Sequence, residues 1–377
     1  MEIANKQSTI SKTVIKEYTQ ENISEASSLI QQGKLVAFPT ETVYGLGANA
    51  LNAEACQLIF TSKERPLTDP LIVHVHSLEQ ALSLIDQSCE KILQIFKQMA
   101  THYWPGPLTM VVKANLEVIP NMITAQTGFV GLRMPNHPIA LDLIKSSGLP
   151  IAAPSANKFG HVSPTKAEHV YKDFHVDSEV FIIDGGSCSF GIESTVLKIT
   201  YDESQEKPFM LKILRRGGVS QQNLNQTLQS MGMDSQCQLE SVKNDHYTEE
   251  TENLEAPGQF LRHYSPDIDS YLFNGLKDDS QLELANCVLL DFGGLFLSLK
   301  ERVKYYYDLS AQGDYNEAIN VIYDQLRWAE TKQDSKCVLI TNFIELLGES
   351  EKDKSGHEHK EALFDRIFRA TSGKKIS

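Results

Sequence analysis

The sequence lacks closely spaced cysteines. None of its six cysteines belongs to a C-x-x-C pair, which excludes a zinc ribbon and argues against a disulfide framework. We therefore predict reduced thiols and no protein-bound metal. The cysteines lie at Cys56, Cys89, Cys188, Cys237, Cys287 and Cys337.

Long hydrophobic runs are also missing. The first residues, MEIANKQSTISKTVIKEYTQ, lack the apolar core that a signal peptide would have. The hydrophobic stretch that starts at Cys287 is interrupted by Asp and Gly. We expect a cytoplasmic protein with no membrane contact.

Positive charge is scarce. Lys and Arg number 35 against 49 Asp and Glu, and the formal net charge is −14. This balance argues against a general nucleic-acid coat protein. A hydrophobic content of 41% over 377 residues is typical of a folded chain and allows two or three domains.

Several catalytic motifs are absent as well. The chain has no P-loop and no G-x-S-x-G nucleophile elbow. Residues 45–50, GLGANA, fit the G-x-G-x-x-A dinucleotide fingerprint, but no acidic residue ends a second strand at the required distance. We therefore expect no organic cofactor.

What the chain does contain is an alternation of strands and helices between about residues 22 and 230. Asn52 is a candidate N-cap, and Ser163 followed by Pro164 predicts another helix start. The pattern indicates an α/β sheet domain. Strands are predicted at 35–39, 71–75, 108–112, 130–134, 151–155, 180–184 and 194–199, and helices at 90–100 and 137–148.

A second, smaller α/β domain is predicted after a break in the pattern. Residues 234–256 are polar and acidic, and 256–266, APGQFLRHYSP, carry aromatic and basic residues between two prolines. We divide the chain into an N-terminal extension (1–21), a main domain (22–232), a linker (233–266) and a C-terminal domain (267–377).

Polar and basic side chains follow several predicted strands and one helix. Thr40, Ser155, Asn157 and Ser194 are neutral, whereas Lys63, Arg65, Arg133 and Arg215 are cations. Strand ends of an α/β sheet commonly border a pocket, and four cations there suit a polyanion such as a nucleoside triphosphate. Helix-dipole complementation explains Lys63 and Arg65 equally well.

At these residues the sequence resembles the YrdC-like L-threonylcarbamoyladenylate synthases, in their longer two-domain form. The match also covers APGQFLRHYSP and, more weakly, RIFRATSG near the C-terminus. Its ordered blocks are FPTETVYGLGANA, KERPLTDPLIVHV, WPGPLTMVV, VGLRMPNHPIALDLI, GLPIAAPSANKFGHVSPTKAEHV, IIDGG and GIESTVLKI.

The resemblance implies a nucleotidyltransferase that converts L-threonine, bicarbonate and ATP, with Mg²⁺, into threonylcarbamoyl-AMP and pyrophosphate. A separate transferase complex then uses the product to form N6-threonylcarbamoyladenosine at position 37 of tRNAs that read codons beginning with A. The implied fold is an open, twisted α/β sheet with a large concave cavity, followed by a small Rossmann-like domain. Contact with tRNA or double-stranded RNA is a further implication.

The resemblance also implies roles for individual residues. Tyr264 of the linker would close over the cavity as a lid. One departure from the family pattern is Arg215-Arg216-Gly217, where the family usually has Arg-Pro-Gly. The L-threonine residues would be Thr40, His74, Arg133, Ala153 and Ser194; the ATP residues Lys63, Arg65, Asp69, Ser155, Ser163, Arg215 and Tyr264; and the catalytic residues Lys63, Arg65, Ser155 and Asn157.

Two other functions stay open at this point. A basic concavity could hold RNA without any adenylation, although the net charge of −14 and the absence of aromatics interleaved with Lys or Arg argue against it. A carbamoyl-adenylate former of the hydrogenase-maturation type would carry extra cysteine-rich and acylphosphatase-like modules, which this sequence lacks.

Overall fold

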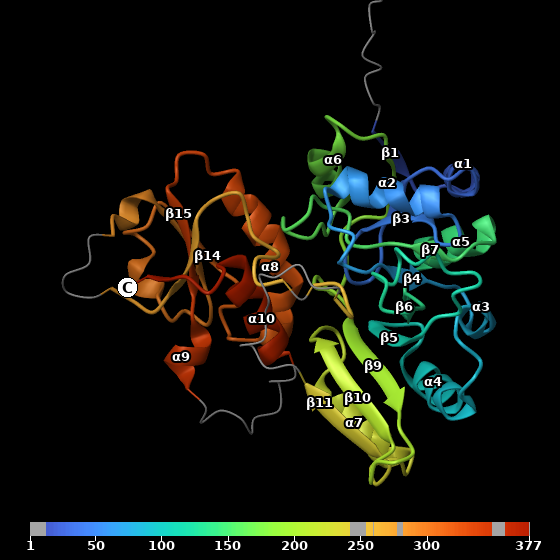
Figure 1. Cartoon of the computed structure of the whole chain (residues 1–377). Coiled ribbons are helices and arrows are strands. Elements are labelled where there is room, and N and C mark those ends of the chain that lie inside the picture. The colour runs from blue at the N-terminus through green and yellow to red at the C-terminus, as the bar shows by residue number, and fades with distance from the viewer. Residues whose placement is uncertain (1–12, 242–253, 259, 277–281, 349–358, 377) are drawn as a thin grey trace, which may run out of the picture.

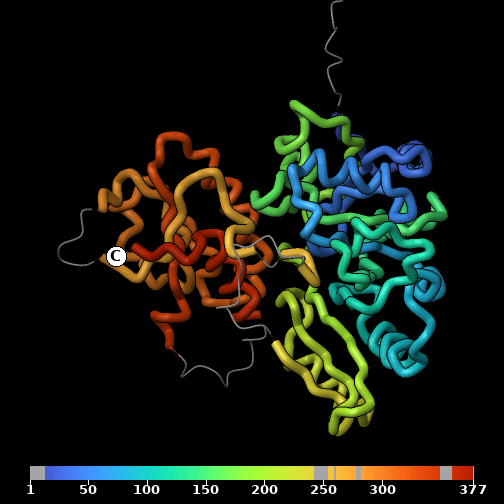
Figure 2. The backbone as a smooth tube through the Cα atoms, in the orientation of Figure 1, coloured from blue at the N-terminus to red at the C-terminus, as the bar shows by residue number. Residues whose placement is uncertain are grey.

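The computed structural model describes residues 13–241, 254–258, 260–276, 282–348 and 359–376. These residues form two α/β domains side by side (Figure 1), and the same division is visible in the chain trace (Figure 2). One domain is built on an eleven-stranded sheet and the other on a five-stranded sheet, counted over the described residues. The predicted α/β class with two domains is therefore confirmed.

The first sheet is mixed and has the order β1-β8-β2-β3-β7-β4-β6-β5-β9-β10-β11. Parallel pairing of β4 with β6 places His74 opposite Arg133. The strands are β1 (Val14–Glu17), β2 (Val36–Phe38), β3 (Gly45–Asn49), β4 (Ile72–His74), β5 (Leu108–Lys113), β6 (Phe129–Arg133), β7 (Ile151–Ala152), β8 (Phe181–Asp184), β9 (Thr195–Tyr201), β10 (Phe209–Arg215) and β11 (Cys237–Ser241).

Seven helices accompany this sheet in the described part of the chain. Strands β9 to β11 and helix α7 extend away from the rest of the domain (Figure 1). The helices are α1 (Gln20–Gln31), α2 (Ala53–Lys63), α3 (Leu78–Ser83), α4 (Glu90–Tyr103), α5 (Pro138–Ser147), α6 (Ala167–Phe174) and α7 (Gln221–Ser230).

Most of the predicted strands and the Asn52 cap are confirmed. The Asn52 side chain accepts hydrogen bonds from the amides of Glu54 and Ala55, as an N-cap should. The expected helix start at Ser163 is wrong, because α6 begins only at Ala167. The Ser163 hydroxyl donates to Glu193 at 2.6 Å, and residues 163–166 are not helical.

The structure also adds strands where the sequence pattern showed none. β1 lies in the segment that we treat as an N-terminal extension and pairs with β8. β11 lies in the segment interpreted as a linker and pairs with β10. Each is an edge strand held by one neighbour, and an edge strand needs no continuous apolar run to be stable.

The second domain has five strands in the order β14-β13-β15-β12-β16, and all four pairings are parallel. Strands β13 and β15 are buried along their whole length, which explains their continuous apolar sequences CVLLD and CVLIT. The elements are β12 (Ser270–Phe273), β13 (Cys287–Asp291), β14 (Tyr305–Asp308), β15 (Cys337–Thr341), β16 (Lys375–Ile376), α8 (Tyr315–Glu330), α9 (Phe343–Leu347) and α10 (Lys360–Ala370), with short 3-10 helices at Leu284–Asn286 and Leu297–Leu299.

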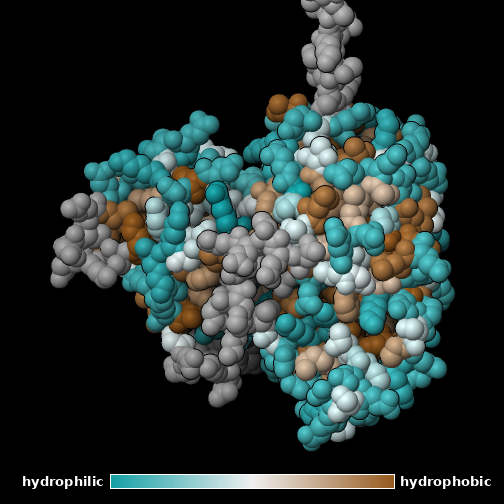
Figure 3. Space-filling view, in the orientation of Figure 1, coloured by the Kyte–Doolittle hydropathy of each residue, from teal (hydrophilic) through white to brown (hydrophobic). Residues whose placement is uncertain are grey.

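Helices α8 and α10 lie on the side of the second domain that faces the first (Figure 1). Val43, Val162 and Ile192 of the first domain belong to the same apolar cluster as the core of the second. Hydrophobic residues on the visible face of the first domain are scattered among hydrophilic ones (Figure 3). No helix in the described segments is both long and apolar enough to span a bilayer.

Buried ion pairs complete the domain junction. Arg366 of α10 donates from Nε to Glu193 of the first domain at 2.9 Å, and Tyr323 of α8 donates to the same carboxylate at 2.9 Å. Arg327 of α8 pairs with Asp173 of α6 at 3.0 Å. Since these groups are almost fully buried, each charge depends on its partner across the junction.

We predict that Arg366→Met lowers the free energy of unfolding by about 3–5 kcal/mol, because it leaves the Glu193 carboxylate buried without its cation. The control is Lys34→Met, which removes an exposed pair with Glu179 and should cost less than about 1 kcal/mol. Urea unfolding of the full chain measures both, and Trp104 and Trp328 give one fluorescence reporter in each domain. Equal small losses in the two variants would contradict this account of the junction.

Candidate active site

A small cavity lies where several strands of the first sheet end. β4, β6 and β10 end at His74, Arg133 and Arg215, which all line it. Its volume is about 40 Å³, enough for a few water molecules and far too small for a nucleotide. The predicted residues that line it are Thr40, Arg65, His74, Arg133, Ala153, Ser155, Ser194 and Arg215.

Arg133 is buried and already engaged. Its guanidinium pairs with the Glu41 carboxylate at 2.7 Å and donates to the Thr42 hydroxyl at 3.0 Å and the Gly106 carbonyl at 3.2 Å. A buried arginine needs an anion nearby, and Glu41 supplies one. An incoming carboxylate would therefore compete with Glu41 for Arg133.

His74 lies beside Arg133 on the neighbouring strand and is 4% exposed. Burial, and then the positive charge of Arg133, lower the pKa of His74 to about 3. The ring is therefore neutral at physiological pH, and it meets Phe38 edge to face at a centroid distance of 6.1 Å. A neutral imidazole can accept or donate one hydrogen bond in the cavity.

Two hydroxyl groups border the cavity on either side of Arg133. Thr40 donates to the Val43 carbonyl at 2.6 Å and lies 2.8 Å from the Thr42 hydroxyl. The hydroxyl of Ser194 lies 2.7 Å from that of Thr109 and accepts from Arg215 Nη2 at 3.1 Å. Ser194 thus connects the cavity to the Arg215 guanidinium.

Arg65 follows helix α2 and faces the cavity from the other side. Its Nη2 pairs with Asp69 Oδ1 at 2.9 Å, and it also donates to the carbonyls of Asp69 and Pro70. Asp69 is fully buried, and burial raises the pKa of its carboxyl group. Asp69 therefore contacts Arg65 directly but does not line the cavity.

Lys63 and Asn157 support the loop that follows β7. The Lys63 ammonium donates to the carbonyl of Ser155 at 2.6 Å and to that of Asn157. Burial, and then the charge of Arg65, lower the pKa of Lys63 well below its ordinary value. The Asn157 amide donates to the carbonyls of Lys158 and His161 at 2.8 Å. Neither side chain belongs to the cavity lining in this conformation.

Glu193 is a cavity residue to which the sequence assigned no role. It accepts from Ser163 at 2.6 Å, which places Ser163 behind the cavity wall. Burial would raise the pKa of Glu193, but the guanidinium groups of Arg366 and Arg215 outweigh it and lower the pKa. Neither Glu41 nor Glu193 was assigned a role from the sequence. The motif around each glutamate does not show which arginine it will pair with.

The linker covers the cavity. Pro257, Gly258 and His263 belong to its lining. Gly258 has a φ of +81°, which favours glycine, and a Cβ atom there would lie only 3.0 Å from the Tyr264 hydroxyl and 3.2 Å from Arg215 Cδ. Tyr264 is fully buried, and the guanidinium groups of Arg366 and Arg369 lie 4.8 and 4.6 Å from its ring centroid.

The size of this cavity differs from the large concavity that the resemblance implied. The predicted residues surround only about 40 Å³, because the linker and the paired side chains fill the space. A cavity of about 1200 Å³ does exist, but it lies at the domain junction and is lined by residues such as Arg262 and Lys374. Binding of ATP at the predicted residues therefore requires the linker to move.

We predict that His74 makes the fold sensitive to mild acid. Its pKa lies below the value of 6.5 for a free side chain, so the unfolded chain takes up the proton first and stability falls as the pH drops below 6.5. His74→Gln should reduce the loss between pH 6.5 and about 5 by about 1–2 kcal/mol, measured by urea unfolding at each pH. An unchanged pH dependence would show that His74 is not held neutral.

Two family models together cover most of the chain. The model described as "Telomere recombination" (Sua5_yciO_yrdC) matches residues 28–217, half of the chain. The model described as "Threonylcarbamoyl-AMP synthase, C-terminal domain" matches residues 219–372. The two matches meet just after β10.

Curated relatives carry the name threonylcarbamoyl-AMP synthase. The Pyrococcus abyssi protein is 42% identical over 253 residues, which is 67% of this chain and 68% of that protein. The Bacillus subtilis protein is 39% identical over 65% of this chain and 64% of its own length. The Schizosaccharomyces pombe protein is 35% identical over 88% of this chain and 76% of its own length.

A solved structure supports the same relationship over both domains. The crystal structure of P. abyssi Sua5 complexed with L-threonine has a TM-score of 0.74 and 31% identity to this chain. The match covers 98% of this chain and all of the P. abyssi chain. The chain therefore belongs to the threonylcarbamoyl-AMP synthase family, in its two-domain form.

Proposed function

We propose that this chain forms threonylcarbamoyl-AMP and pyrophosphate from L-threonine, bicarbonate and ATP. The observation that carries the proposal is the convergence of Arg133, Arg65 and Arg215 on one buried cavity. The three arginines suit a carboxylate and a polyphosphate held close together, which are the anionic groups of the two larger substrates. The name of the family's curated members supports the same reaction.

In this proposal L-threonine binds beside Arg133. Its α-carboxylate takes the place of Glu41 on the guanidinium, and the hydroxyl groups of Thr40 and Ser194 and the neutral ring of His74 lie close enough to the cavity to contact the rest of the amino acid. Ala153 leaves room for its side chain. The P. abyssi Sua5 structure, which holds L-threonine, supports a threonine site in this family.

ATP then binds on the side of Arg65, Ser155 and Arg215, with Ser163 and Asp69 behind the cavity wall. Lys63 lies next to Arg65 and reaches the triphosphate only if it releases the carbonyls of Ser155 and Asn157. We infer that Mg²⁺ enters with ATP on its phosphate oxygens, since Glu193, Glu41 and Asp69 are each already paired with an arginine.

These residues act by position and charge. The carbamate formed from threonine and bicarbonate supplies the attacking oxygen, and pyrophosphate leaves from the α-phosphorus, so the protein needs no nucleophile of its own. Cations aimed at the phosphate oxygens stabilise the charge that develops there. A dry cavity protects the carbamate and its mixed anhydride from water.

The linker is the proposed lid. It must move to admit ATP into a cavity of about 40 Å³ and return to exclude water. Tyr264 ties the linker to α10 through Arg366 and Arg369, so closure and domain contact are coupled. Within the proposal, the product passes in the cytoplasm to a threonylcarbamoyl transferase complex that modifies tRNA. Direct contact of this chain with tRNA or double-stranded RNA would bring the two steps together.

We predict that the purified chain yields threonylcarbamoyl-AMP only when ATP, bicarbonate and L-threonine are all present. Mass spectrometry with each substrate omitted in turn, and pyrophosphate quantified alongside, measures this. Lys63→Ala and Arg133→Ala should each lower the yield about 100-fold or more, because Arg133→Ala removes the cation proposed for the threonine carboxylate and Lys63→Ala releases the loop that carries Ser155. The exposed Lys145 provides the control, since Lys145→Ala should retain full yield. Salt-sensitive RNA binding without any ATP consumption would favour the RNA-binding function instead.

We predict that Tyr264→Leu lowers the fraction of consumed ATP that is recovered as intact threonylcarbamoyl-AMP, because the linker no longer seals the cavity. A point variant is the cleaner test, since deleting the second domain would also take Arg366 away from Glu193. The exposed Tyr171 is the matched control, and Tyr171→Leu should recover the wild-type fraction. Equal recovery from Tyr264→Leu would rule out a sealing role for this side chain.

A further inference from the structure

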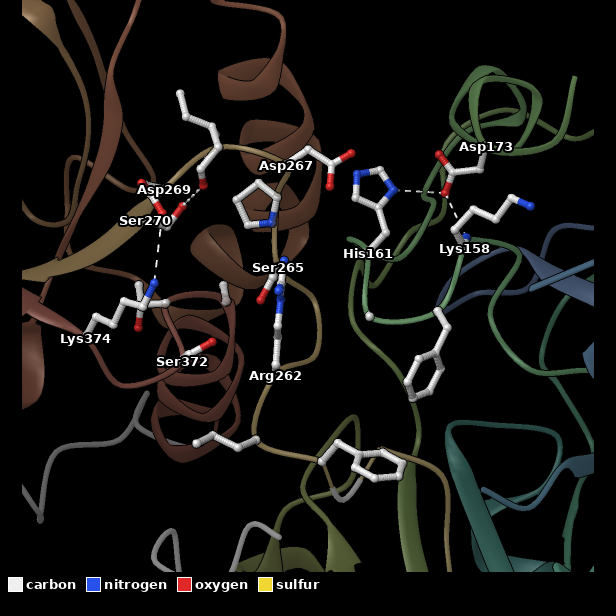
Figure 4. A pocket seen from close by; sticks show the side chains of 18 of the residues that line it. Lys158, His161, Asp173, Arg262, Ser265, Asp267, Asp269, Ser270, Ser372 and Lys374 are labelled. Carbon is white, nitrogen blue, oxygen red and sulfur yellow. Dashed lines mark hydrogen bonds and ion pairs between the residues drawn. The ribbon is translucent and has the colours of Figure 1, made fainter. Parts of the chain in front are cut away.

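The cavity of about 1200 Å³ at the domain junction lies outside the proposed active site. Figure 4 shows it between the loop that carries Lys158 and His161 in the first domain and the segment from Arg262 to Ser270 that enters the second. His161 and Asp267 lie on facing sides of this space, with the imidazole ring directed at the Asp267 carboxylate (Figure 4).

Three metal-ligating side chains meet at the rim of this cavity. His161 comes from the first domain, Asp267 from the chain just after the linker, and Glu330 from the last residue of α8. One ligand atom from each lies within 4.8 Å of the other two. Because the three residues are far apart in the sequence, no motif spacing could reveal them.

A hydrogen bond at Nδ1 fixes the orientation of the His161 ring. Asp173 Oδ2 lies 3.0 Å from His161 Nδ1. Asp173 is itself fixed by both terminal nitrogens of Arg327, each at 3.0 Å, and by the backbone amide of Lys158 at 3.2 Å. A carboxylate on the far nitrogen of a histidine is the usual support of a metal-bound imidazole.

This support leaves two acceptors in close contact. Asp173 accepts a hydrogen bond from Nδ1–H, so Nε2 of a neutral ring carries a lone pair and faces Glu330 Oε1, 2.7 Å away. An ion bound by both atoms would require them to move slightly apart, since Zn–N and Zn–O bonds are each about 2.0–2.2 Å long.

We propose that His161, Asp267 and Glu330 form a binding site for a divalent transition-metal ion such as Zn²⁺. One imidazole nitrogen and two carboxylate oxygens are ligands that Zn²⁺ takes readily, and water from the open cavity completes a tetrahedral shell. Mg²⁺ is disfavoured, since it prefers oxygen ligands in an octahedral arrangement.

The ion would join three separate parts of the chain. It would connect the loop after Asn157, the start of the second domain at Asp267, and the end of α8 at Glu330. The linker runs between the active site and this point, because Ser265 donates its amide to the Gly160 carbonyl at 2.9 Å. A bound ion would therefore resist separation of the domains on the side where the linker leaves the cavity.

Calorimetric titration of the metal-free full chain with ZnCl₂ at about pH 8, where protons compete less, tests the site. We expect one Zn²⁺ per chain and a melting temperature that rises with Zn²⁺. Asp267→Asn should weaken binding at least tenfold, and because Asp267 is exposed, this variant leaves the fold intact. His161→Gln should abolish binding, and Asp173→Asn should weaken it by about 10- to 100-fold.

The control is His175→Gln, an exposed histidine outside the cluster, which should bind Zn²⁺ as the wild type does. Co²⁺ in place of Zn²⁺ should give the visible absorption of a four-coordinate ion in the wild type and not in Asp267→Asn. No ATP or L-threonine is present, so the outcome is independent of the proposed reaction. Absence of saturable Zn²⁺ binding, or binding that Asp267→Asn and His161→Gln leave unchanged, would overturn the proposal.

Discussion

The buried carboxylate of Glu193 is the point on which the active site and the domain arrangement both depend. It lines the cavity, yet its partners come from two domains: Ser163 from the first, and Tyr323 and Arg366 from the second. A buried carboxylate is tolerated only when such partners satisfy it. The second domain is therefore part of the electrostatic structure of the cavity.

The same arrangement explains why the cavity is closed. Arg366 pairs with Glu193 and also lies against the ring of Tyr264, as does Arg369. The linker is thus held by the helix that stabilises the cavity wall. Opening for a nucleotide must disturb these contacts, which couples substrate entry to the position of α10.

Each cation of the cavity has an internal partner in this closed state. Arg133 is paired with Glu41, Arg65 with Asp69, and Arg215 donates to Ser194. In this chain of net charge −14, these internal partners compensate the buried arginines when no substrate is bound. Substrate anions would replace or share these partners. The exchange also favours ligands with the charge and shape to compensate every guanidinium.

Features that depend on neighbouring residues could be predicted from the sequence, whereas features that depend on distant residues could not. Apolar runs and local capping determined most of the central strands and the Asn52 cap, because those signals act over a few residues. Strands β3 and β10, the edge strands β1 and β11 and the start of α6 escaped prediction. The edge strands depend on pairing with β8 and β10, which their own residues do not reveal.

The candidate site divides in the same way. The order of the motif blocks by itself determined the family and the residues that converge on the cavity. Only the tertiary structure decided that Lys63 and Asn157 hold a loop, that Glu41 and Glu193 serve as counter-ions, and that His161, Asp267 and Glu330 meet at the junction. Which distant charges pair depends on where folding brings their residues, and the spacing of those residues along the chain does not show it.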